Sequence, residues 1–137
     1  MTAITAPTTT AAKGSFLRFA IRLDAVLSGL MGIVGIPLAP RMAELSGTTT
    51  AFEYSIGAFF IAYGVAVYGL SLKQRVRRLG TILVVGNLVY TALAVVFVLA
   101  GVMPLTTTGI VLTLGSGVFT LVMAELQYQG LRRLKRA

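Results

Sequence analysis

Four apolar stretches of about twenty residues each constrain this chain more than any other feature. They lie at about residues 16–38, 52–72, 81–102 and 109–128. A helix rises about 1.5 Å per residue, so each stretch can cross roughly 30 Å of hydrocarbon. Lipid offers backbone groups no partners, so only helices and closed barrels can span it, and the period-two alternation of barrel strands is missing. We therefore predict an all-α fold, a membrane-embedded antiparallel four-helix bundle.

The composition agrees with a membrane location. Of 137 residues, 56% are hydrophobic and only 12% are charged, whereas soluble domains carry roughly 25% charged residues. Most of the surface must therefore face something other than water. The net charge of +8 does not indicate nucleic acid as a partner, because the positive charges adjoin apolar spans, where anionic lipid headgroups attract Lys and Arg.

The basic residues are distributed unevenly between the two ends of this predicted bundle. Eleven of the twelve Lys and Arg residues precede or begin the first span, join the second to the third, or follow the fourth, and only Arg41 lies on the other side. Cytoplasmic loops collect Lys and Arg. We therefore expect both termini and the middle loop to be cytoplasmic. The eleven residues are Lys13, Arg18, Arg22, Lys73, Arg75, Arg77, Arg78, Arg132, Arg133, Lys135 and Arg136.

The chain divides into one domain and two tails. Residues 1–14 are rich in Thr and Ala without an apolar period, which predicts a disordered cytoplasmic tail. Residues 15–131 form the four-helix domain, with a polar outer loop at 39–51, and 132–137 form a basic cytoplasmic tail. Runs of three threonines precede both the second and the fourth span, which leaves open a duplication that produced two hairpins.

Two residue types that carry much enzyme chemistry are missing. The chain has no Cys and no His, which excludes disulfides, thiolate nucleophiles, and metal or haem ligation by these side chains. The sequence also lacks a phosphate-cradling loop and a nucleophile motif. We therefore expect no enzyme activity, no cofactor and no metal.

Small residues recur at helical spacing on the first two spans. Such faces let helix backbones approach closely in a membrane. We favour packing within the chain, but a face for a homodimer or larger complex, or a lipid groove, stays open because spacing does not separate them. The predicted packing residues are Ser28, Gly29, Gly32, Gly35, Gly57 and Gly64.

Three of the four spans carry a strong polar group at similar depth. Asp24, Asn87 and Glu125 lie about 10–12 Å along their helices from the cytoplasmic end. Ionisable groups inside a membrane cost about 2.5–3.5 kcal/mol on insertion scales, so they tend to face the bundle interior and to pair. Glu125 points about 140° away from the small polar stripe of its helix, whereas Gln127 follows that stripe.

We therefore predict a ligand-binding cluster in this layer. An arginine supplies the counter-charge to Asp24, and Arg18 is the alternative to Arg22 for that role. The simplest interpretation is that Asp24 pairs with an arginine and only stabilises the bundle. The alternative is that the layer is a pocket for a headgroup, a quinone or a proton-coupled solute. A carboxyl group buried without a cation could take up a proton, which would suit the last of these. The predicted set is Asp24, Asn87, Gln127, Arg22 and Tyr90.

Basic residues after the second and fourth spans are expected to contact anionic lipid. Each Lys or Arg near the surface contributes about 1 kcal/mol of attraction to anionic headgroups. The predicted headgroup contacts are Arg75, Arg77, Arg78, Arg132 and Arg133.

Three runs carry a resemblance to known proteins: RFAIRLDAVLSGLMGI, IGAFFIAYGVAVYGLSL and VVGNLVYTALAVV. They resemble a group of small four-helix integral membrane proteins of actinobacteria, mainly through residues 22–25, Gly57 and Asn87. The layout alone is similar to DoxX-like four-helix proteins. The resemblance implies a bacterial cytoplasmic (inner) membrane protein and no particular activity.

Three functions remain open from sequence. We favour a non-enzymatic accessory or scaffold subunit, or a lipid-interacting bundle. A small proton-coupled transporter is the second hypothesis, and a subunit that lends a quinone pocket to a membrane redox complex is the third.

Overall fold

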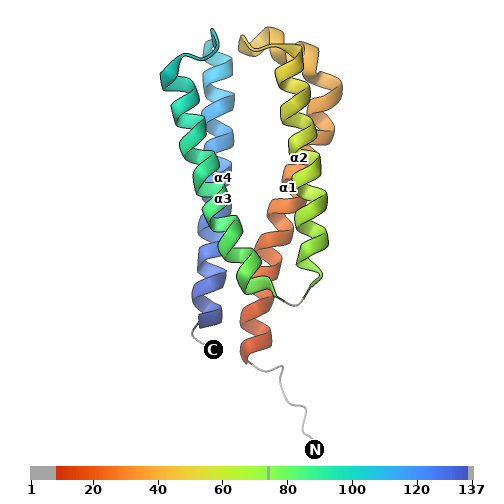
Figure 1. The fold of residues 1–137 in the computed structure, drawn as a ribbon, viewed down its shortest axis with the longest axis vertical. Helices are drawn as coiled ribbons and strands as arrows, with labels where there is room; N and C mark the ends of the chain where they lie inside the picture. The colour runs from red at the N-terminus through yellow and green to blue at the C-terminus, as the bar shows by residue number, and fades with distance from the viewer. Residues whose placement is uncertain (1–8, 74, 136–137) are drawn as a thin grey trace, which may run out of the picture.

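The computed structural model describes residues 9–73 and 75–135, and within these ranges it contains four helices and no strand (Figure 1). The all-α prediction is confirmed. By length and composition all four helices could cross a membrane. The helices are α1 (Thr9–Ser46), α2 (Thr50–Ser71), α3 (Val76–Ala100) and α4 (Thr107–Lys135).

Helix α1 is much longer than predicted. It begins inside the expected tail, of which residues 1–8 lie outside the described part, and it continues through most of the expected loop 39–51. Pro37 and Pro40 lie within it, although each proline removes one backbone donor. The segment that suggested a loop continues the helix to Ser46, and Ala39, Ala43 and Ser46 are buried within it. On its exposed face Arg41 pairs with Glu44, three residues on, at 3.8 Å.

Local capping fixes the link between α1 and α2. The link begins at Gly47, whose φ of 77° lies in the left-handed region that favours glycine. The Thr49 side chain then accepts a hydrogen bond from the Phe52 amide at 3.0 Å. Glu53 lies in the first turn of α2, near the positive end of the helix dipole, and accepts a bond from the Thr48 hydroxyl at 2.6 Å.

The boundaries of α3 and α4 also differ from the predicted ones. Helix α3 begins at Val76, five residues before the expected span, and ends at Ala100. The next residue, Gly101, caps it with a left-handed φ of 64°. Helix α4 continues to Lys135, so most of the expected basic tail 132–137 is helical, and residues 136–137 lie outside the described part. Hydropathy locates the apolar centre of a helix. The charged residues on either side of that centre are also helical here, so the observed helices are longer than the apolar stretches.

The four helices form two closely packed pairs. Helix α1 packs along α2, and α3 along α4; α1 also contacts α4, whereas α2 and α3 barely meet. In Figure 1, α1 begins and α4 ends at the same end of the molecule, where the α2–α3 link also lies, and the other two links lie at the opposite end. The described basic residues other than Arg41 therefore gather at one end, called the basic end below.

Glycines set the distance between α1 and α2. A methyl group at Gly64 would lie 2.6 Å from the Ala25 carbonyl oxygen and 2.9 Å from the Gly29 Cα, closer than van der Waals contact allows. One at Gly32 would overlap the Gly57 carbonyl. Four of the predicted packing glycines therefore meet in pairs within the chain, as expected for small faces.

One predicted packing residue does not pack. A methyl group at Gly35 would meet nothing within 4 Å. Helical spacing placed Gly35 near the small face of α1, but a side chain there would point into open space. Ser28, in contrast, is buried, with 2% of its surface exposed.

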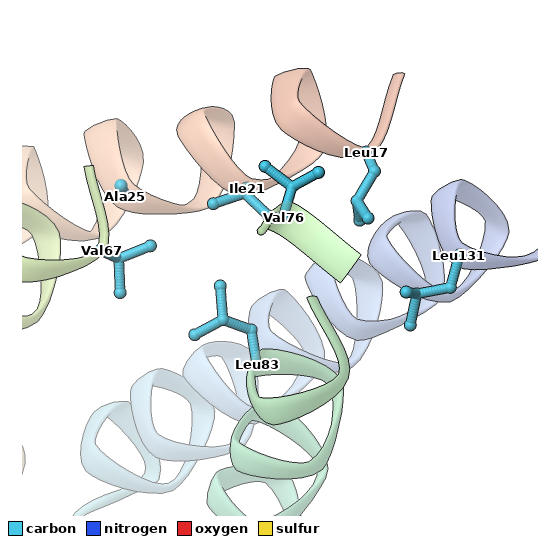
Figure 2. Close-up of a cluster of buried hydrophobic side chains, with 7 residues drawn as sticks. All are labelled: Leu17, Ile21, Ala25, Val67, Val76, Leu83 and Leu131. Atoms are coloured by element: carbon cyan, nitrogen blue, oxygen red, sulfur yellow. The ribbon is translucent and has the colours of Figure 1, made fainter. Parts of the chain in front are cut away.

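The apolar core lies towards the basic end. Figure 2 shows side chains from all four helices converging there. Elsewhere the usual burial pattern is inverted, because large apolar side chains such as Leu99 and Val65 are 80% and 71% exposed. The core residues are Leu17, Ile21, Ala25, Val67, Val76, Leu83 and Leu131.

We predict that Gly64→Ala destabilises the chain by about 1–3 kcal/mol, because the added methyl group forces α1 and α2 apart. Gly69→Ala is the matched control on the same helix, since a methyl group there meets nothing within 4 Å. Unfolding by SDS in mixed micelles, followed by circular dichroism, measures both. Equal stability of the two variants would contradict the close approach at Gly64.

Candidate functional site

A buried carboxylate lies where all four helices meet. Asp24 on α1 is 0% exposed. Its Oδ2 accepts three hydrogen bonds: from the Tyr63 hydroxyl at 2.7 Å, the Asn87 amide at 2.9 Å and the Gln127 amide at 2.8 Å. Its Oδ1 accepts a bond from the Ser28 hydroxyl at 3.1 Å. These five residues are called the polar cluster below.

The amides of the cluster also bond to each other. Asn87 donates a second hydrogen bond to the Gln127 side-chain oxygen at 3.0 Å. One turn along α3, the Thr91 hydroxyl donates to the Asn87 carbonyl at 3.0 Å and lies 2.8 Å from the Thr120 hydroxyl of α4. The predicted contact among Asp24, Asn87 and Gln127 is therefore present. That this set binds a ligand stays a prediction.

Contrary to expectation, neither Arg22 nor Arg18 pairs with Asp24. Arg22 donates from Nε to the Ser71 hydroxyl at 3.1 Å, and its guanidinium lies 5.6 Å from the centre of the Tyr68 ring. Arg18 donates to the Ser71 carbonyl and, at 3.0 Å, to the Lys73 carbonyl. The last carbonyls of α2 lack helical partners and carry the negative end of the dipole, which draws both guanidinium groups away from Asp24.

Neutral donors therefore hold the carboxyl group of Asp24. Among the side chains of residues 14–73 and 75–134, the one ion pair is that of Arg41 with Glu44. The interpretation that Asp24 pins the bundle through an arginine is wrong: the four side chains that bond it are a serine, a tyrosine and two amides. A polar group surrounded by donors avoids the penalty of unpaired burial.

Tyr90 is not part of this cluster. Its hydroxyl donates to the Ser116 hydroxyl at 3.1 Å, and its ring centre lies 5.9 Å from that of Phe60. The tyrosine that reaches Asp24 is Tyr63, which sequence reasoning missed. A signal for it existed: pairing Gly64 with Gly29 sets the register of α2 against α1, and Tyr63 precedes Gly64 by one residue.

Glu125 lies outside the cluster, as its helical direction indicated. Its side chain is exposed and accepts a hydrogen bond from the Gln129 amide at 2.8 Å, one turn along α4. The small polar stripe of α4, in contrast, faces α3, where Ser116 and Thr120 make the contacts given above.

A second candidate site lies at the basic end. A cavity of about 910 Å³ has four arginines in its lining, together with apolar side chains that include Val76 and Ile82. It brings together three of the five residues predicted to contact headgroups. The lining arginines are Arg18, Arg75, Arg77 and Arg78.

The other two predicted headgroup residues lie apart from this cavity. Arg132 lines a neighbouring cavity of about 530 Å³, between α3 and α4, which shares Arg77 and Thr81 with the first. Arg133 instead packs its guanidinium 4.1 Å from the centre of the Phe16 ring, where it makes a cation–π contact.

Comparisons with known proteins assign no function to these sites. No family model matches the chain, and searches of curated proteins and of solved structures found no match. Function is therefore inferred below from geometry.

We predict that Asp24→Leu destabilises the fold by about 2–5 kcal/mol, because it leaves the Tyr63, Asn87 and Gln127 donors without their acceptor. Asp24→Asn keeps one acceptor oxygen in a side chain of the same shape, so we expect a loss of about 1 kcal/mol. SDS unfolding of both variants in mixed micelles measures the difference. Equal losses would show that hydrogen bonding at Asp24 does not hold the helices together.

Proposed function

We propose that this chain is a non-enzymatic, multi-pass membrane protein that binds anionic lipid headgroups at its basic end. The observation that carries the proposal is the arginine-lined cavity of about 910 Å³ at that end. In this view the four helices form an antiparallel bundle in a bacterial cytoplasmic membrane, with both termini in the cytoplasm. The chain acts there as an accessory or scaffold subunit.

The outward apolar surface supports the membrane location. Residues such as Leu99 and Val65 are largely exposed, whereas Asp24 and Gln127 are fully buried. Water would disfavour that arrangement, since soluble proteins rarely expose large contiguous apolar patches. Hydrocarbon favours it, because polar groups in lipid must find partners inside the protein.

The charges of the cavity support an anionic ligand. Arg75, Arg77 and Arg78 make no ion pair with any residue in the described ranges, and all three are exposed. Guanidinium groups bind phosphate oxygens through paired N–H donors. Three of them at one cavity suit a phosphate of a lipid headgroup at the membrane surface.

The apolar lining suits the rest of a lipid. Val76 and Ile82 line the first cavity, and Val84, Val85 and Leu131 line the neighbouring one. The two cavities share Arg77 and Thr81. A phosphate in the first cavity therefore leaves an acyl chain beside apolar side chains of α3 and α4.

Replacement of Arg75, Arg77 and Arg78 by Gln should weaken binding of phosphatidylglycerol by about fivefold per residue removed, since each arginine contributes about 1 kcal/mol. Native mass spectrometry of the purified protein, titrated with phosphatidylglycerol or phosphatidylcholine, measures the preference. Arg41→Gln is the matched control, because it removes one charge from the other end. If the triple variant keeps the full preference for the anionic lipid, the headgroup site is wrong.

The orientation has a direct test because the chain contains no cysteine. We expect a membrane-impermeant maleimide to label Thr107→Cys on intact cells and to label Lys73→Cys only after the membrane is opened. Both residues are exposed and lie at opposite ends of the molecule. The reverse labelling pattern would overturn the proposed orientation.

A further inference from the structure

A separate cavity lies in the half of the molecule remote from the basic end. Its volume is about 360 Å³, within the range of roughly 300–1,000 Å³ of small-molecule pockets. It is lined by residues of all four helices, at the end where α2 and α3 stand apart (Figure 1). It is called the aromatic cavity below, and its lining includes Phe52, Glu53, Phe60, Tyr90, Phe97 and Ser116.

Four aromatic rings form the walls of this cavity. Phe52 of α2 stacks on Phe97 of α3, with ring centres 5.5 Å apart. Deeper in, Phe60 of α2 and Tyr90 of α3 lie 5.9 Å apart. The faces of aromatic rings carry partial negative charge and attract cations, most strongly where water is excluded.

A carboxylate stands among these rings. Glu53 is half-buried in the lining and accepts a hydrogen bond from Thr48, which also lines the cavity. Among the described side chains, no cation lies within ion-pair distance of Glu53, and the one ion pair joins Arg41 to Glu44. No Lys or Arg lines the cavity. Its net charge is therefore negative, in contrast to the basic end.

The floor of the cavity adjoins the polar cluster. Phe60 precedes Tyr63 by three residues on α2, and Tyr90 follows Asn87 by three on α3. One helical turn thus separates the aromatic floor from the donors that bond Asp24. The carboxyl group of Asp24 therefore lies about one helical turn beyond Phe60 and Tyr90. It adds to the preference of the cavity for a positively charged ligand.

We propose that the aromatic cavity binds a hydrophobic organic cation. The rings and apolar side chains take up its hydrocarbon surface, and Glu53 neutralises its charge. An anionic lipid is unsuited to the cavity because the carboxylate repels phosphate. The proposal does not depend on the headgroup site, which involves other residues at the other end.

Tetraphenylphosphonium tests this with tetraphenylborate as its control, since the two ions have nearly the same size and shape but opposite charge. Equilibrium dialysis in neutral detergent, corrected with protein-free micelles, measures both on the full-length protein that carries Arg75→Gln, Arg77→Gln and Arg78→Gln. These substitutions remove the anion site at the basic end, so binding of the anion there does not enter the comparison. We expect the cation to bind at least about tenfold more tightly than the anion, and Glu53→Gln to weaken cation binding by about tenfold. Glu44→Gln, an exposed carboxylate near the same end, should leave binding unchanged.

Ring variants provide a second, independent measurement. Phe97→Leu keeps apolar volume but removes a ring, so cation binding should fall several-fold, whereas Tyr90→Phe keeps the ring and should keep most of the binding. Equal binding of the two ions would overturn the proposal and indicate an apolar groove for acyl chains. Unchanged cation binding in Glu53→Gln would also overturn it; if that variant does not fold, unchanged binding in Phe97→Leu decides against it.

Discussion

The arrangement of the four helices depends on how one buried carboxyl group is satisfied. Asp24 is fully buried and has no counter-ion within the described residues, and burying a polar group without hydrogen-bond partners costs free energy. One of its oxygens accepts bonds from Tyr63, Asn87 and Gln127, which come from three different helices. Each of these helices reaches the oxygen through one side chain, so the bond constrains both the position of the helix along its axis and its rotation. A single acceptor therefore aligns α2, α3 and α4 against α1.

The helices are held together within each pair and between the pairs by different kinds of contact. Glycine pairs bring α1 and α2 into direct contact, and hydroxyl groups join α3 to α4. Between the two pairs, contact comes from the polar cluster, from the core towards the basic end, and from Thr106, which bonds to the last carbonyls of α1 at the remote end. Between these contacts α2 and α3 diverge and leave the aromatic cavity. The two candidate sites thus lie at opposite ends with opposite charge, separated by the layer that holds the molecule together.

Much of this was predictable, and the errors have physical causes. Apolar length gave four helices, and helical direction selected Gln127 over Glu125. Arg22 was misassigned because a sequence pattern shows which charges are near in the chain, but not that the carbonyls at the end of α2 compete for them. Tyr63 was missed because its reach to Asp24 depends on the register of α2. The length of α1 was underestimated because polar residues and prolines suggested a loop.

The distribution of the Asp24 partners along the chain has a consequence for the order in which the helices come together. Two of them, Ser28 and Tyr63, belong to α1 and α2, which are synthesised first. The carboxyl group therefore has interim partners while the later helices are still emerging from the ribosome. When α3 and α4 pack against the first two helices, Asn87 and Gln127 donate two further hydrogen bonds to Asp24. These bonds stabilise the assembled molecule at the buried carboxyl group, which otherwise lacks part of its partners.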